Sequence, residues 1–556
     1  MADCGAGEGS RDGLGNWVRR AALGAVFVGM LQTSVGLAAE PAAPLTLTPC
    51  DVPGLQEKAR CATYEVWENR ETRSGRRIAL KVLVLPATGT GGSHPLNCEI
   101  FLPPGDLQAT LGSFFPLEAI RQCRATLEKD ADLKLYTTSV GMDDIDEVRA
   151  ALGYDRLNIL GGSYGTRAAQ VYMRRHPEHV RTAILEGTVP MDDKLPLHIP
   201  PGAERALEGV LAECTQDAAC HAAFPKLEDE SAAVWARLVK GPVTARVLDP
   251  NTGEAVDVSL SRNLAAEGVR YMLYSSSASG EVPVVLHQAF LGDFTAIAEQ
   301  AVTGRVQIVA SGSIGMYLSV TCAEDVPWID PSEAERLAAG TFIGDYRYVQ
   351  QRAACGLWPR ATVPKAFLEP VDASVPVLLI TGMWDPATPP SDAEQVARHL
   401  PKNLNVVVPH GGHGLDGLDG VECVTNLEIE FVGRGSLEGL STVCIDKIRR
   451  RPFRLEPLEL NVIALPEADL RKFLGSFVGE GEPAQAEVVL KAGKLHLQVA
   501  GEGDFLLAPV TKTRFRVAGA SGFLVDFDVA GGVVRSATLI DAGNPVMKLV
   551  PKPKAN

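Results

Sequence analysis

Short apolar runs and longer amphipathic stretches alternate along most of this sequence. The runs at 157–160, 182–185, 375–381 and 404–408 are rich in Val, Ile and Leu, which predicts buried strands. Stretches with helical spacing of apolar residues predict helices at 117–127, 142–152, 203–213, 230–238, 284–300 and 333–339. Strands that alternate with helices are typical of an α/β fold with a parallel sheet. The helices after position 190 interrupt this alternation and predict a long helical insertion before the strand-like run at 375–381.

The pattern changes near the C-terminal end. Segments 494–499, 514–517 and 523–529 alternate apolar and polar residues and are separated by glycine-containing turns. This alternation predicts half-buried strands. We therefore expect a small β-barrel or curved-sheet domain, similar to the lipocalin-like tail domains of some secreted hydrolases.

A serine lies in a glycine-rich turn directly after the first apolar run. Residues Gly161-Gly162-Ser163-Tyr164-Gly165 have the form G-x-S-x-G, and a helix-forming run follows them. This is the context of a nucleophile elbow, a strained turn that presents a serine hydroxyl above the sheet. The N–H of Tyr164 would then face the oxygen of a carbonyl under attack. The alternative is an ordinary tight turn, but the strand before and the helix after it favour a catalytic Ser163.

A serine nucleophile needs a base and a carboxylate that orients the base. Asp385 follows the run at 375–381, and His413 follows the run at 404–408, in the chain order Ser, Asp, His of α/β-hydrolases. Both are loop residues after neighbouring strands, where this fold gathers its chemistry. Asp385 could instead be a turn residue before proline, and His410 is a rival for the base.

The chain resembles the tripeptidyl and prolyl aminopeptidase-like serine peptidases of the α/β-hydrolase superfamily. The matching motifs lie at 136–138, 161–166, 174–180, 184–187 and 380–385, together with His413, within a resemblance that runs from about Cys50 to Cys444. The resemblance implies Ser163 as nucleophile, Asp385 as orienting carboxylate and His413 as base. It also implies release of amino acids or short peptides from free N-termini.

The implied architecture is an α/β-hydrolase doubly wound sheet with a helical lid insertion and a small C-terminal β domain. The predicted parts are a signal peptide (1–39), the core (40–190 and 371–448), the helical lid (191–370), a linker (449–466) and a β-barrel-like accessory domain (467–556). The apolar run 21–31 after Arg19-Arg20 predicts export, to a periplasmic or extracellular location. A membrane anchor is the alternative, but the run is short, and we expect no stable membrane insertion once the leader is removed.

Central strands that this fold places before the elbow are missing from the sequence. After strand-like segments at 63–67 and 78–85, Thr88 runs directly into Gly89–Gly92, a segment that resembles a later part of the family sequence. The missing part would include the loop that supplies the second oxyanion-hole N–H. Either the chain carries an internal deletion or an error in the gene model, or Gly89–Gly92 acts as a shortened oxyanion loop. We favour a deletion, because a glycine run cannot replace two strands.

Composition narrows the function further. The chain has 556 residues, 46% of them hydrophobic, and a net charge of −15, which argues against nucleic-acid binding. Removing Cys4 with the leader leaves an even number of cysteines, which predicts disulfides in an exported protein. Sequence proximity suggests the pairs Cys50–Cys61, Cys98–Cys123, Cys214–Cys220, Cys322–Cys355 and Cys423–Cys444. Because no C-x-x-C or matching histidine spacing occurs, we expect no metal and no cofactor.

Two carboxylates are candidates for binding the α-ammonium group of a peptide substrate. Glu324 lies beside a suggested disulfide, and Glu186 ends the strand after the elbow. The alternative for both is an ordinary solvated or capping carboxylate.

Taken together, these features of the sequence predict a secreted serine aminopeptidase. The alternatives are a catalytically impaired remnant without the oxyanion loop, or an esterase of the same fold.

Overall fold

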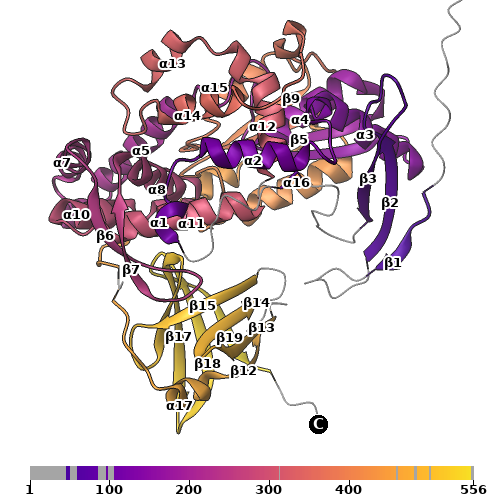
Figure 1. The fold of residues 1–556 in the computed structure, drawn as a ribbon. Coiled ribbons are helices and arrows are strands. Elements are labelled where there is room, and N and C mark those ends of the chain that lie inside the picture. Colours follow the sequence, from indigo (N-terminus) through magenta and orange to yellow (C-terminus); the bar gives the residue numbers. More distant parts are fainter. Residues whose placement is uncertain are drawn as a thin grey trace, which may run out of the picture. The chain divides into compact units, whose positions relative to one another are not determined.

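The computed structural model describes residues 45–50, 59–84, 96–97, 106–311, 313–458, 461–480, 485–499 and 503–552 (Figure 1). The predicted signal peptide and the glycine run at 89–92 lie outside these residues. Within the described part of the chain, no helix combines the length and the apolar character needed to cross a membrane.

The core of the fold is a four-stranded parallel sheet with the order β4-β5-β8-β9. Its strands are β4 (Leu157–Gly162), β5 (Val180–Glu186), β8 (Val377–Gly382) and β9 (Asn403–Val408), which match the four predicted runs. In β5 and β8, alternate side chains enter two different hydrophobic clusters, one on each face of the sheet. Burial on both faces explains why these strands are continuous apolar runs rather than alternating ones.

Helices cover both faces of this sheet. Helices α4 (Tyr164–Arg175) and α15 (Pro390–Ala397) contribute to the cluster on one face, whereas α16 (Glu422–Arg434) contributes to the cluster on the other. Helix α3 (Thr138–Ala151) precedes β4 and packs along α4. This arrangement confirms the predicted α/β-hydrolase fold class.

Strand β4, which leads into the elbow, lies at the edge of the sheet. Among the described residues it pairs only with β5, and Leu160 on it is 60% exposed. The upstream strands β1 (Thr48–Cys50), β2 (Ala59–Trp67) and β3 (Arg77–Val84) form a separate antiparallel sheet. An elbow strand with one open edge is the expected consequence of the missing central strands.

The chain between β5 and β8 forms a largely helical insertion. Its elements are α5 (Ile199–Gln216), α6 (Ala218–Ala223), α7 (Leu227–Val239), β6 (Val243–Leu248), β7 (Ala255–Leu260), α8 (Arg262–Tyr274), α9 (Ser276–Ser279), α10 (Val282–Leu291), α11 (Thr295–Ser311), α12 (Ile314–Glu324), α13 (Pro331–Ala338) and α14 (Tyr346–Cys355). The prediction of a single helix at 284–300 was wrong, because two helices, α10 and α11, cover this segment. Gly292 ends α10 with a left-handed φ of +111°, and Asp293 accepts a hydrogen bond from the N–H of Thr295 as α11 begins.

The C-terminal segment forms a closed barrel of strands β12 to β19, which confirms the predicted β domain (Figure 1). The strands are β12 (Gly475–Gly479), β13 (Gln485–Lys491), β14 (Lys494–Val499), β15 (Gly503–Pro509), β16 (Arg514–Val517), β17 (Ala520–Ala530), β18 (Val533–Asp541) and β19 (Asn544–Pro551). Phe473, Phe515 and Phe527 pack against one another in its core.

The remaining helices and strands of the described chain are α1 (Leu107–Thr110), α2 (Leu117–Leu127), β10 (Leu418–Asp419), β11 (Arg449–Arg450) and α17 (Glu467–Leu470).

Candidate active site

Ser163 occupies the turn between β4 and α4. Its φ of +53° is in the left-handed region, which a non-glycine residue adopts only under strain. A Cβ at Gly161 would lie 2.3 Å from the carbonyl oxygen of Gly165, so the turn can close only with glycine there. The N–H of Ser163 donates to Glu186 O at 2.8 Å and ties the turn to β5. These features are those of a nucleophile elbow.

Tyr164 is the first residue of α4, so the start of the helix directly follows Ser163. Backbone N–H groups at a helix start have no partner within the helix and favour negative charge. The Tyr164 hydroxyl lies 2.7 Å from Thr138 Oγ1, which fixes the side chain away from the helix start. The assignment of Tyr164 N–H as an oxyanion donor stays a prediction. The loop expected to supply the second donor falls outside the described residues.

Asp385 is fully buried in the loop after β8. Its Oδ1 accepts hydrogen bonds from the N–H groups of Ala387 and Thr388, both at 2.8 Å. Its Oδ2 accepts from the Thr388 hydroxyl at 2.8 Å and lies 2.8 Å from His413 Nδ1. Four partners hold this carboxylate in one orientation, and the loop Asp385-Pro386-Ala387-Thr388 supplies three of them. Sequence reasoning missed Thr388, although its position three residues after Asp385 was visible.

His413 receives its orientation from Asp385 and from the helical insertion. The contact with a carboxylate places the proton on Nδ1 and leaves Nε2 free as a base. The ring of Tyr274 packs edge-on against the His413 ring at a centroid distance of 5.0 Å. Ser276 Oγ accepts from Gly412 N–H at 2.9 Å and donates to Gly414 O at 2.7 Å, so it bridges the backbone on both sides of His413. Nothing in the local sequence indicated Tyr274 or Ser276.

Ser163 and His413 both follow the carboxyl ends of strands in the same parallel sheet. Gly187 follows β5, between the strands that carry the two residues, and its φ is +60°. A Cβ on Gly187 would lie 3.1 Å from His413 Cε1 and 3.3 Å from Asp385 Oδ2. Ser163 Oγ and His413 Nε2 share no hydrogen bond in the described part of the chain. Such contacts are often long in unliganded sites and shorten when substrate binds.

His410 lies in a different environment. Its Nδ1 is 2.7 Å from Glu213 Oε1, and Glu213 also accepts from Trp384 at 2.6 Å and from Arg450 at 2.8 Å. Burial acts to raise the pKa of Glu213, but hydrogen bonds from His410 and Trp384 and the charge of Arg450 lower it to about 2. His410 is therefore bound to a second carboxylate and not to Asp385, which favours His413 as the base.

Glu324 is buried at the end of α12, and both of its oxygens contact one residue. Oε1 accepts from Thr138 N–H and Oε2 from the Thr138 hydroxyl, each at 2.7 Å. Burial raises the pKa of Glu324 to about 7, although the Thr138 hydrogen bonds act in the opposite direction. Because Thr138 also contacts Tyr164, Glu324 lies two hydrogen bonds from the residue after the nucleophile. In this arrangement it holds the start of α3.

Glu186 lines a cavity of about 220 Å³ that His413 and Glu428 also line. Burial, together with a hydrogen bond to Glu186 and the charge of Glu186, raises the pKa of Glu428 to about 8. Two carboxyl groups in contact therefore share this cavity beside the candidate base. A positively charged group between them would relieve their repulsion.

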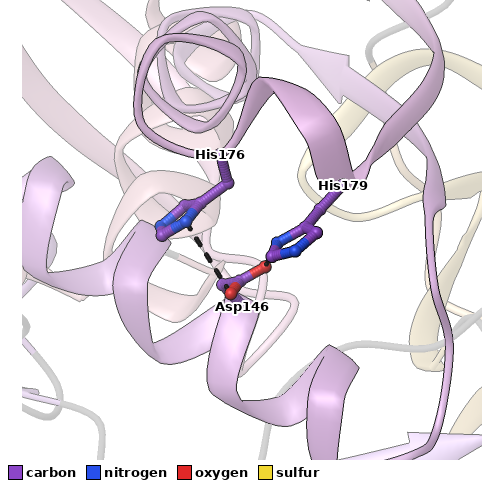
Figure 2. Close-up of side chains that lie close together, drawn as sticks. All are labelled: Asp146, His176 and His179. Carbon is purple, nitrogen blue, oxygen red and sulfur yellow. Dashed lines mark hydrogen bonds and ion pairs between the residues drawn. The ribbon is translucent and has the colours of Figure 1, made fainter. Parts of the chain in front are cut away.

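Figure 2 shows Asp146 between the rings of His176 and His179, the group of described residues most similar to a metal site. The Asp146 carboxylate already accepts from His179 and Tyr172 at 2.7 Å and from Arg149 at 2.8 Å. Burial acts to raise the pKa of Asp146, but these hydrogen bonds lower it to about 2. The Arg149 guanidinium already supplies a positive charge to this carboxylate. The group is better explained as a hydrogen-bonded link between α3 and the end of α4.

The structure pairs the described cysteines as sequence proximity suggested. Disulfides join Cys50–Cys61, Cys214–Cys220, Cys322–Cys355 and Cys423–Cys444. Cys123 is also disulfide-bonded, but its suggested partner Cys98 lies outside the described residues.

Residues 128–415 match the family model described as the alpha/beta hydrolase fold. The match spans more than half of the chain and includes the elbow, the helical insertion and the loops of Asp385 and His413. The chain belongs to the α/β-hydrolase fold family.

Particular relatives refine this class. The chain is 25% identical to "Serine protease Hip1" of Mycobacterium tuberculosis over 47% of its own length and 53% of that protein. It is 24% identical to the "Tripeptidyl aminopeptidase" of Streptomyces coelicolor over 66% of this chain and 70% of that protein. A solved serine hydrolase of Cycloclasticus zankles shares 15% identity over 55% of this chain and 74% of that chain, at a TM-score of 0.24. The resemblance to tripeptidyl aminopeptidase-like serine peptidases is confirmed, while the match spans about half the length of Hip1.

Proposed function

We propose that this protein is a serine hydrolase that forms an acyl-enzyme on Ser163. The observation that carries the proposal is the buried Asp385 carboxylate, 2.8 Å from His413 Nδ1, at the same sheet edge as the strained elbow serine. In the first step His413 Nε2 takes the proton from Ser163 Oγ as Oγ bonds to the substrate carbonyl carbon. His413 then gives this proton to the leaving amine. Water, deprotonated by His413, then attacks the acyl-enzyme, and His413 returns this proton to Ser163 Oγ as the acid is released.

Within this class we propose an aminopeptidase that acts on peptides with a free N-terminus. The names of the two relatives support peptides as substrates. The cavity that Glu186, Glu428 and His413 share supports recognition of an ammonium group, because a cation there would favour ionisation of both carboxylates. Glu186 is therefore better placed than Glu324, whose oxygens contact Thr138.

Blocking the substrate amine tests this specificity. We expect the Ala-Pro-Ala aryl-amide to be cleaved with a kcat/KM at least about tenfold higher than its N-acetylated form. The loss of a charge-assisted hydrogen bond of about 1.5–3 kcal/mol predicts a ratio of this size or larger. The ratio should fall toward one in Glu186→Gln, whereas exposed Glu178→Gln should retain it. Equal rates on both substrates in the wild type, or faster cleavage of simple aryl esters alone, would favour an endopeptidase or an esterase.

The second candidate function is a catalytically impaired hydrolase. It is supported by the open edge of β4 and the 60% exposed Leu160 in the described structure. Loss of one oxyanion donor costs about 2.7–4 kcal/mol. We therefore expect that inserting a relative's segment after Thr88 raises kcat by about 100- to 1,000-fold or converts an insoluble chain into a soluble one. Equal, robust rates with and without the insert would mean that Gly89–Gly92 suffices.

We also propose that the chain is exported, with residues 1–39 as a signal peptide and a periplasmic or extracellular destination. The disulfides support an oxidising compartment, because such bonds are rare in the cytosol.

A further inference from the structure

Three arginines lie buried together in the helical insertion. Arg270 on α8 is 3% exposed, and Arg305 on α11 and Arg347 on α14 are each 5% exposed. We call Arg270, Arg305 and Arg347, with the fully buried Glu267, the arginine cluster. None of these residues takes part in the proposed hydrolysis.

Glu267 is the one carboxylate that contacts these guanidinium groups in the described part of the chain. It accepts from Arg305 at 2.9 Å and from the Tyr346 hydroxyl at 2.9 Å, and Arg347 Nη1 lies 4.0 Å away. Arg270 donates to the Tyr274 hydroxyl at 2.7 Å and not to a carboxylate. Three positive charges and one negative charge leave the arginine cluster with an excess of two positive charges.

Several hydrogen-bonding groups in and beside the arginine cluster also lack a partner. Among described residues, Nε and Nη1 of Arg347, Nε of Arg270 and the Tyr271 hydroxyl are buried without a hydrogen-bond partner. The ring of Phe114 offsets part of the charge, because Arg347 stacks on it at 3.8 Å and Arg305 at 4.5 Å. Cation–π contacts do not satisfy the N–H groups that point elsewhere. Buried charge without a counter-charge is strongly unfavourable, so the arginine cluster needs an anion.

We propose that the arginine cluster binds a small monovalent anion, either a free ion such as chloride or the carboxylate group of a ligand. The site is connected to the proposed base, because Arg270 holds the hydroxyl of Tyr274, and the Tyr274 ring packs on His413. Bound anion would stabilise the helical insertion and the surface on which His413 rests.

Thermal unfolding of the full chain at constant ionic strength tests the site. Replacing sodium methanesulfonate, whose anion is bulkier and carries no carboxylate, with sodium chloride should raise Tm by about 2–4 °C, as expected for a ligand that binds only the folded state. Parallel samples in formate and acetate separate the two sources: a shift only with these salts would identify a carboxylate as the occupant. The absence of a shift with chloride, formate and acetate would overturn the proposal. This readout does not depend on turnover, so it fails or succeeds separately from the proposed hydrolase.

A variant and a matched control test whether the anion-dependent rise in Tm comes from the arginine cluster. Arg347→Met, which removes both unpartnered Arg347 N–H groups, should abolish the anion-dependent shift. Arg246→Met, which removes an exposed arginine paired with Asp257, should retain it. If Arg347→Met fails to fold, bromide-soaked crystals of the wild type decide the question. Anomalous density within hydrogen-bond distance of Arg270 or Arg347 supports the site. Where chloride raises Tm, bromide only at surface positions overturns the proposal. Where only formate or acetate raises Tm, formate-soaked crystals without carboxylate density beside these arginines overturn it.

Discussion

The substitution Ser163→Ala is expected to lower kcat by at least about 10⁴-fold, because it removes the hydroxyl that we propose forms the acyl-enzyme. Ser163 is the residue with a strained φ of +53° at the end of β4. Its turn closes only because Gly161 lacks a side chain. A fluorophosphonate probe should label the wild type at Ser163 and leave the alanine variant unlabelled, as judged by mass spectrometry.

Two controls keep this result interpretable. Thermal unfolding should show that Ser163→Ala is folded, because the side chain contributes no packing to the hydrophobic clusters. Ser391→Ala, in an exposed serine at the start of α15, should keep full labelling. Labelling of the Ser163→Ala variant at another serine would show that the elbow does not carry the nucleophile.

His413→Ala should reduce kcat by a similar factor of at least about 10⁴, whereas His410→Ala should keep turnover within about tenfold of the wild type. Of the two histidines, His413 is the one that contacts Asp385, through Nδ1, so its Nε2 is the nitrogen that would accept the serine proton. His410 instead contacts Glu213. Its removal should lower stability by about 1.5–3 kcal/mol, the usual contribution of a hydrogen bond to a charged group. Steady-state kinetics and urea unfolding of both variants measure the two effects.

The opposite pattern, with turnover lost in His410→Ala and retained in His413→Ala, would contradict the proposed base. Asp385→Asn provides a further check on the same pair. It keeps the shape of the side chain, but it can favour the wrong tautomer of His413, and should reduce kcat by about 10⁴-fold.

The elements nearest the site were predictable because they depend on local pattern. The strand at 157–160, the turn around Ser163 and the following helix are specified by apolar runs and by glycines within a few residues. The runs before Asp385 and His413 are equally local, and both became neighbouring strands. The helix expected at 284–300 failed because one glycine and one capping aspartate outweigh a continuous apolar pattern.

By itself the sequence determined the fold class, a C-terminal β domain, and the order of Ser163, Asp385 and His413 as candidates; closure of that domain into a barrel was decided by the tertiary structure. Only the tertiary structure decided that Asp385 contacts His413 while His410 contacts Glu213. It also decided that Tyr274 and Ser276, from the helical insertion, pack on and bridge the histidine loop. The arginine cluster belongs to the same category, since its members come from three different helices. Such contacts join residues far apart in the chain, and they form only when helices and strands pack, so no local periodicity encodes them.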